Sequence, residues 1–349
     1  DQARQYEVTQ YPAIVFESQK RYRRVSSTEI AREAEHAFTS AIMEVTGIIQ
    51  KKVYFLTGHG ESNINSTASD GYDKARISLR DNLYQIETLD LLYSPSIPED
   101  CAALIISGPR QALTNDEVQI IERYLEGNGR ALFLIDPTYP QEINQVLSAW
   151  GVKMGDGIII DQSSYVDPNK DIPLVTRQGN VFGLAKIFFP GATAILPQEQ
   201  VAENIEIMAT VWTGENSWLE KDLVPGEEPE FNEEEDAKGP LAIGVYIAAI
   251  ISGSDEASEV EQGTTLIIFG DSDFASNEHF YNGNNSDLFI TSINVITTGT
   301  ELVSIERKVL PFRRLVVSAE ETNIIRYTSI GLLPLLVLIA GGVIWWRRR

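Results

Sequence analysis

The chain contains one cysteine, three histidines and far fewer basic than acidic side chains. With Cys101 alone, an intrachain disulfide is excluded, and the apolar run at 102–106 favours a small core residue over a reactive thiol. The net charge of −22 excludes a nucleic-acid-binding protein, which needs a basic face. It also disfavours a domain that lies flat on anionic lipid.

Several motifs are missing as well. The chain has no Walker or G-x-G-x-x-G pattern for nucleotide phosphates and no H-E-x-x-H spacing for zinc. A G-x-S-x-G nucleophile elbow is absent, although Ser107 follows a predicted strand. There is no internal repeat and no heptad run. We therefore predict a protein that is not an enzyme, has no cofactor and does not hydrolyse ATP itself.

The longest uncharged run, residues 327–346, predicts a transmembrane helix. At 1.5 Å per residue its 20 residues extend about 30 Å, the thickness of the hydrocarbon core of a bilayer. Tyr327 and the pair Trp345–Trp346 stand at its two ends, where aromatic side chains favour the membrane interface. Gly341 and Gly342 would allow a second helix to approach closely in lipid.

The charges around this run predict its orientation. Arginines 347–349 favour a cytoplasmic tail, and long domains cross membranes largely regardless of the charge that flanks them. Because residues 327–346 are uncharged and the tail holds three arginines, residues 1–326 carry −25. We predict an extracytoplasmic domain followed by a juxtamembrane segment, 313–326. The chain begins at Asp1 without a visible signal peptide, so we expect an upstream segment that delivers the domain across the membrane.

Apolar runs alternate with helical patterns over most of the chain. An N-terminal part, 1–48, is expected to hold two short strands around 13–24 and a helix over 27–44 whose capping box is incomplete. Further strands are predicted at 52–56, 85–91, 102–106, 131–135 and 264–269, and helices at 76–83, 114–125, 140–150 and 284–298. This alternation is typical of βαβ units around a parallel sheet that is covered on both faces. Residues 49–312 are therefore predicted to form one α/β domain.

The middle of that domain is less regular. Within an irregular insertion, 151–262, we predict strands only at 157–161, 193–196 and 241–251. The insertion includes an acidic loop, 215–239, with a dense group of carboxylates at 227–236. Its spacing matches no EF-hand, so a solvated loop is favoured over a calcium site.

Parallel strands end at a common edge of their sheet, and ligands bind in the crevice there. Four predicted strand-end loops should meet at this edge, and their polar side chains are the candidate site: His59, Glu61, Ser107, Arg110, Asp136, Asp271 and Asp273. The carboxylates and the histidine could hold a divalent metal, whose identity the sequence leaves unknown. A binding crevice without catalysis is a second interpretation. The third is that these residues only shape turns, since Asp and Gly cap helices and permit positive φ.

At these loops the chain resembles a known family. The segments that carry the resemblance are VYFLTGHGE (53–61), the stretch 98–109, LTNDEVQIIERYLEGNGRALFLIDP (113–137) and LIIFGDSDFASN (266–277). Together with the C-terminal run they resemble the auxiliary component of uncharacterised ABC transport systems, the family of the gliding-motility component GldG. The resemblance implies a three-layer α/β domain, flavodoxin-like and similar to the GIFT domain of intraflagellar transport, with a single C-terminal transmembrane helix.

The resemblance also implies a function and partners. The chain would be a non-catalytic accessory subunit in a bacterial inner membrane, with an ABC-2-type permease and a separate ATPase as partners. It would recognise substrate or partner outside the cytoplasm, for example in gliding motility or envelope export, either singly or as a homo-oligomer. The alternative from a different class is a membrane-tethered, metal-dependent hydrolase or a carbohydrate-binding domain that acts alone.

Overall fold

The structure, a computed structural model, describes most of the chain between residues 12 and 298 and little beyond. The described residues are 6, 8, 12–19, 21–47, 50–198, 201–221, 223, 228–250, 262–298, 327, 328, 345 and 347.

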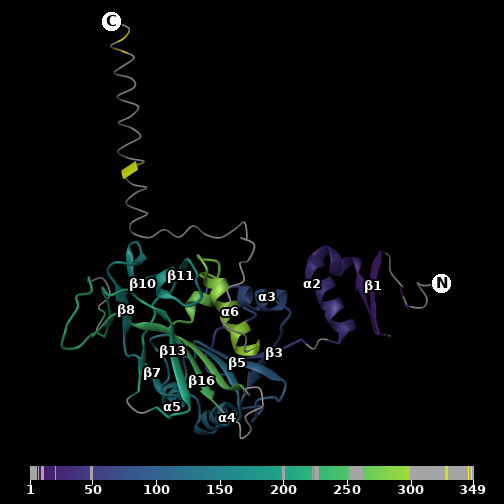
Figure 1. Ribbon diagram of the computed structural model, residues 1–349, viewed down its shortest axis with the longest axis horizontal. Coiled ribbons are helices and arrows are strands. Elements are labelled where there is room, and N and C mark those ends of the chain that lie inside the picture. The colour runs from purple at the N-terminus through teal and green to yellow at the C-terminus, as the bar shows by residue number, and fades with distance from the viewer. Residues whose placement is uncertain are drawn as a thin grey trace.

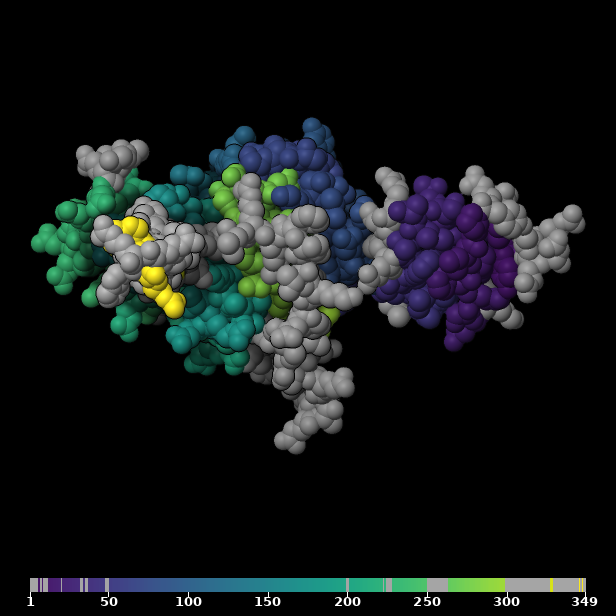
Figure 2. Space-filling model, turned by 90° about the horizontal axis from the view of Figure 1, so that it is seen from above, coloured from purple at the N-terminus to yellow at the C-terminus, as the bar shows by residue number. Residues whose placement is uncertain are grey.

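A β-hairpin and a long helix form a unit of their own at the N-terminal end. Strands β1 (Ala13–Ser18) and β2 (Arg21–Ser26) pair antiparallel, and both contact helix α2 (Ser27–Thr46). The two strands and the helix that the sequence predicts here are confirmed. Figures 1 and 2 show this unit, in purple, to one side of the α/β domain.

Helix α2 has a complete capping box, contrary to the sequence interpretation. Ser26 is the N-cap: its Oγ accepts a hydrogen bond from Glu29 N at 3.3 Å, and Glu29 Oε2 accepts one from Ser26 N at 2.7 Å. The interpretation was wrong because it took Ser27 as the cap and therefore found Ile30 at the position that Glu29 fills relative to Ser26.

The α/β domain is built on a seven-stranded sheet of order β13-β16-β17-β6-β5-β3-β4. The strands are β3 (Lys52–Thr57), β4 (Gln85–Asp90), β5 (Cys101–Ser107), β6 (Arg130–Leu134), β13 (Ile205–Trp212), β16 (Ala242–Ile250) and β17 (Gln262–Phe269). The strands β4, β3, β5, β6 and β17 are parallel, in an order also found in flavodoxin-like sheets. Strand β16 is antiparallel to both of its neighbours. The predicted mixed α/β fold with a mostly parallel central sheet is confirmed.

Helices cover both faces of this sheet (Figure 1). They are α3 (Asp73–Asp81), α4 (Asn115–Glu126), α5 (Glu142–Ser148) and α6 (Asn285–Thr298). Val53 and Phe55 share one buried cluster with residues of α3 and α6, whereas Tyr54 and Leu56 share a second with residues of α4 and α5. Because successive side chains of a strand point to opposite faces, this division places the sheet between two layers of helices.

The region between α5 and β16 contains more strands than the sequence predicts. They are β7 (Val152–Met154), β8 (Ile158–Asp161), β9 (Tyr165–Val166), β10 (Asn169–Thr176), β11 (Lys186–Phe188), β12 (Ile195–Pro197), β14 (Ser217–Glu220) and β15 (Ala237–Lys238), besides β13 and the short 3-10 helix η1 (Arg177–Gly179). The first part of the predicted acidic loop is the buried strand β14. Residues 228–235 are exposed or half-buried, as expected of a solvated loop. The division of the chain into domains stays a prediction.

The predicted membrane span lies largely outside the described residues, which include only positions 327, 328 and 345 of it. Among the residues that the structure does describe, no helix is long and apolar enough to cross a bilayer. The juxtamembrane segment, 313–326, is also outside them.

Candidate functional site

Four strand-end loops meet at one edge of the central sheet. Arg110 N donates a hydrogen bond to the His59 carbonyl oxygen at 2.8 Å, which joins the loops after β5 and β3. Ser272 N donates to Asp136 Oδ1 at 2.6 Å, which joins the loops after β17 and β6. Strand β4 lies on one side of β3 and strand β5 on the other, so the order in which the chain adds strands reverses between β3 and β5. Open α/β sheets bind ligands at such a position. The structure thus brings the candidate residues to one edge, while their role in binding a ligand stays a prediction.

His59 is buried between two carboxylates. Its Nδ1 lies 3.2 Å from Glu61 Oε1, and its Nε2 lies 3.2 Å from Glu117 Oε2. All three side chains are at most 5% exposed. Which ring nitrogen donates and which accepts depends on the tautomer of the imidazole. The arrangement is a buried hydrogen-bonded cluster that fixes the loop after β3 against helix α4.

Glu117 is a member of this cluster that the sequence reasoning missed. The sequence pattern predicts a helix at 114–125 but gives Glu117 no place among the candidate site residues. Its Oε2 also accepts hydrogen bonds from Thr114 N at 2.8 Å and Thr114 Oγ1 at 2.7 Å, which completes a capping box. Burial acts to raise the pKa of Glu117, but the bonds from Thr114 and the contact with His59 lower it below its usual value overall. The T-x-x-E spacing signals the cap, but nothing local signals the contact with His59, 58 residues away.

Asp136 ties the end of β6 to the end of β17. Its two carboxylate oxygens accept hydrogen bonds from Ser272 N and Ser272 Oγ, at 2.6 and 2.8 Å. A Cβ at Gly108 would lie 2.7 Å from Ser272 Oγ and 3.0 Å from Asp136 Oδ2, and Gly108 has a φ of +60°. Only glycine allows the loop after β5 to pass so close to this pair. Burial raises the pKa of Asp136, while the bonds from Ser272 and the charge of Arg110 act against that rise.

Asp271 is buried just before the short helix η2 (Asp273–Ala275), and its carboxylate bonds to the first residues of that helix. Its Oδ1 accepts a hydrogen bond from Asp273 N at 2.9 Å, and its Oδ2 accepts one from Phe274 N at 3.1 Å. Burial, followed by the charges of Asp136 and Asp273, raises the pKa of Asp271 well above its ordinary value. Tyr72 OH donates to the carbonyl oxygen of Ser272 in the same loop. Asp271 thus holds the loop in shape, with both oxygens occupied.

Asp273 differs from Asp136 and Asp271 because no residue in the described part of the chain donates a hydrogen bond to its carboxylate. It is half-buried, and burial together with the nearby Asp136 raises its pKa to about 6, although Arg110 acts to lower it. Arg110 itself is exposed. Of the candidate residues, Asp273 and Arg110 are therefore the pair best placed to meet a molecule from solution.

Replacing Asp273 by asparagine should flatten the pH dependence of stability. A carboxyl whose pKa is raised from 3.8 to about 6 binds its proton more tightly in the folded state. The stability gained from this tighter proton binding is therefore fully present below about pH 4 and is lost as the pH rises to about 6. We expect D273N to be more stable than the wild type at pH 7 by about 1 kcal/mol, since solvent screens a partly exposed charge. Urea unfolding at pH 4 and pH 7 measures this, and an unchanged difference between the two pH values contradicts it.

Two further candidates for a nucleophile are the buried hydroxyl of Ser107 and the partly buried thiol of Cys101. Ser107 is fully buried, and its Oγ has no hydrogen-bond partner within the described part of the chain. Cys101 begins β5, at the opposite end of that strand from the site. Burial raises the pKa of the Cys101 thiol to about 11, so it is protonated at neutral pH. Neither side chain is placed as an activated nucleophile at this edge.

The edge offers little for metal chemistry. Across the described ranges, no group of three or more His, Cys, Asp and Glu side chains is placed to hold a metal ion. Both carboxylate oxygens of Asp136 and of Asp271 already accept hydrogen bonds from the protein. What the arrangement does is join four loops into one rigid surface, on which Arg110 and Asp273 remain accessible.

No curated protein matches the chain. Among solved structures, the chain is similar to the mmIFT52 N-terminal domain, with 16% identity and a TM-score of 0.49, over 71% of this chain and 98% of that one. It is also similar to the exo-beta-1,4-mannosidase Op5Man5 from Opitutaceae bacterium strain TAV5, with 11% identity and a TM-score of 0.34, over 74% of this chain and 38% of that one. With both TM-scores below 0.5, neither similarity bears on what this chain does.

The family comparison covers the first part of the α/β domain. The matched region begins before β3 and ends after β13, so it includes the loops that carry His59, Glu61, Arg110 and Asp136. Residues 50–214 match the model of a family described as an ABC-type uncharacterized transport system, and this part of the chain is similar to that family.

Proposed function

We propose that the chain is a non-catalytic accessory subunit of an ABC transport system. The observation that carries this proposal is the family match over residues 50–214, which spans four of the five parallel strands. The site geometry supports it, because the carboxylates at the sheet edge are engaged in holding loops together. Such an edge suits recognition of a partner or a cargo better than bond cleavage.

The finer parts of the proposal come from the sequence. We propose a GldG-type subunit with a GIFT-like domain outside the cytoplasm, a span at 327–346 in a bacterial inner membrane, and a cytoplasmic C-terminus. An ABC-2-type permease would contact the span, and a separate ATPase would hydrolyse ATP, because this chain has no Walker motif. Arg110 and Asp273 would belong to the surface that meets a partner or a cargo.

The test is recovery of the tagged chain from its native membrane in mild detergent, with partners identified by mass spectrometry. We expect a polytopic permease and a Walker-containing ATPase in constant ratio to the chain. A matched chain that ends at residue 326 should lose both partners, since the proposed contact with the permease lies in the span. Recovery of the full chain alone, or only with copies of itself, would contradict the accessory role.

A further inference from the structure

A cavity of about 360 Å³ lies beside β13, at the opposite end of the central sheet from β4. It opens between β10 with η1 on one wall and the connection from β13 to β14 on the other. Its lining residues are Ser164, Leu174, Val175, Thr176, Gln178, Gly179, Trp212, Thr213, Gly214, Glu215 and Pro240. Because β13 is the outer strand, two strands beyond β17, the cavity is separate from the edge that holds His59 and Asp136. Its volume falls at the lower end of the range of small-molecule pockets, about 300–1,000 Å³.

Internal hydrogen bonds fix the walls of this cavity. The buried Asp161 accepts from Ser163 N and Ser164 N at 2.9 and 2.8 Å, and from Gly214 N at 3.4 Å, which ties the two walls together at their base. The buried Thr213 Oγ1 lies 2.6 Å from Ser217 Oγ and accepts from Leu241 N at 2.8 Å. The cavity is therefore held open by structure that exists without a ligand.

The opposite wall is fixed in the same way. Asn180 Nδ2 donates to the carbonyl oxygens of Thr176 and Leu184 at 2.8 and 2.9 Å, which closes the turn that contains η1. Asn180 also forms a β-bridge with Val211 of β13. A Cβ at Gly179 would lie 2.7 Å from the Trp212 carbonyl oxygen, so glycine allows η1 to pack directly against the end of β13.

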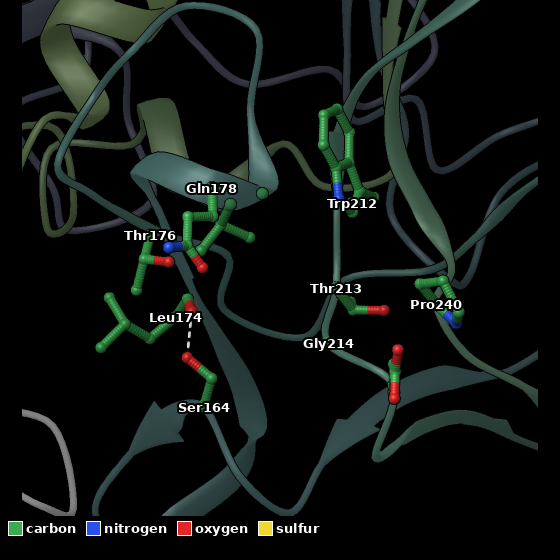
Figure 3. A pocket seen from close by; sticks show the side chains of 11 residues that line it. Ser164, Leu174, Thr176, Gln178, Trp212, Thr213, Gly214 and Pro240 are labelled. Carbon is green, nitrogen blue, oxygen red and sulfur yellow. Dashed lines mark hydrogen bonds between the residues drawn. The ribbon is translucent and has the colours of Figure 1, made fainter.

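Four polar side chains around the cavity make no hydrogen bond to any described part of the protein. They are the hydroxyl of Thr176, the amide of Gln178, the indole N–H of Trp212 and the carboxylate of Glu215. Figure 3 shows Thr176 and Gln178 on one side of the opening and Trp212 on the other. Thr176, Gln178 and Glu215 are exposed and Trp212 is half-buried, so all four are accessible to a molecule in the cavity.

We propose that this cavity binds a neutral, hydroxyl-rich ligand of the size of a sugar unit. A sugar ring has apolar C–H faces and a rim of hydroxyl groups that both donate and accept. The indole of Trp212 offers an apolar surface with one donor, Gln178 and Thr176 offer both donors and acceptors, and Glu215 offers acceptors only. This combination matches the two kinds of surface on a sugar.

The charge of the lining favours this class over two others. Glu215 is the one charged side chain among the lining residues, and it is an acid, which disfavours phosphates and carboxylates. A cationic ligand would use the indole and Glu215 but would leave the amide and hydroxyl groups of the other wall without matched partners. The proposal does not depend on the accessory role, because the cavity shares no residue with the strand-end loops.

The test is saturation-transfer difference NMR on the full chain in a detergent that has no sugar headgroup. The probes are methyl glucoside, methyl mannoside, cellobiose and diacetylchitobiose, with tetramethylammonium as a cationic comparison. We expect transfer to the ring protons of at least one saccharide with a Kd in the low millimolar range. Transfer should weaken about tenfold in the double variant Q178A/E215A, which removes two hydrogen-bonding groups from the rim.

A matched control separates loss of the pocket from a general effect of the substitutions. The variant Q119A/E126A removes the same two residue types from exposed positions on α4 and should bind as the wild type does. Both double variants should keep the wild-type thermal midpoint, since the four side chains replaced are exposed. Absence of transfer from every saccharide, equal transfer in Q178A/E215A, or a response to tetramethylammonium alone would overturn the proposal. Loss of sugar binding would leave co-recovery of the permease and ATPase intact.

Discussion

Replacing His59 by alanine is expected to lower the free energy of unfolding by about 3–5 kcal/mol, because two buried carboxyl groups lose the ring that contacts both. The substitution leaves the carboxylates of Glu61 and Glu117 at most 2% exposed and without the ring that lies 3.2 Å from each. Two acidic side chains would then face one cavity with no ring between them to form hydrogen bonds. Urea unfolding of wild type and H59A, followed by tryptophan fluorescence, measures the difference.

A triple variant tests whether the charge of the two carboxylates causes the loss of stability in H59A. In the triple variant H59A/E61Q/E117Q the carboxylates are neutral, so a substantial part of the lost stability should return, although the gap left by the ring remains. If loss of packing alone were responsible, the triple variant would be no more stable than H59A. A loss below about 1 kcal/mol in H59A would show that the two carboxylates reach solvent when the ring is removed.

The parallel half of the sheet could be predicted because each of its signals is local. The runs at 53–56, 103–106 and 131–135 are continuously apolar, as strands buried on both faces require, and each is followed by a turn residue and a helix. The rule that ligand loops gather at the carboxyl ends of such strands then predicts that His59, Arg110 and Asp136 lie at one edge. Composition and periodicity were sufficient for this part of the fold.

The antiparallel side could be predicted only in part. The predicted strands at 157–161, 193–196 and 241–251 correspond to β8, β12 and β16. Strands β10 (Asn169–Thr176) and β14 (Ser217–Glu220) were missed: both carry polar residues, and β14 is short and pairs with the distant strand β8. Trp218 of β14 is buried, with its indole N–H donating to Glu220 at 3.0 Å, inside a stretch whose composition indicated a solvated loop. The cavity beside Trp212 depends on these pairings, so no sequence pattern pointed to it.

The partners of the candidate residues escaped prediction for a related reason. Glu117 lies 58 residues from His59 along the chain, yet its carboxylate contacts the His59 ring. Ser272 lies 136 residues from Asp136, yet its N–H donates a hydrogen bond to the Asp136 carboxylate. A helix cap and a serine in a turn are common features with local roles, so the neighbouring sequence does not indicate that these residues also contact distant segments. The residue types at the edge were predictable, but the extent to which they bind one another was not.

Gly270 is the position at which a single methyl group should do most damage to this edge. A Cβ there would overlap the carbonyl oxygen of Thr193, whose own N–H donates to the Gly270 carbonyl at 2.6 Å. Since both groups belong to backbone that is paired on either side, neither can move without breaking hydrogen bonds. We expect G270A to lose about 3 kcal/mol or more of stability, measured by urea unfolding.

Gly191 supplies the matched comparison. It has a φ of +75°, but no atom lies within 4 Å of a Cβ placed there, so G191A should lose only about 1 kcal/mol, the strain of a left-handed alanine. Equal losses in the two variants would mean that the overlap at Thr193 relaxes without effect. Gly270 also directly precedes Asp271, Ser272 and Asp273, so its displacement should change the burial of Asp273 and its separation from Asp136, the two main causes of its raised pKa. In G270A the fall in stability between about pH 4 and pH 6 should therefore become shallower along with the overall loss, which connects the packing of one glycine to the electrostatics of the whole edge.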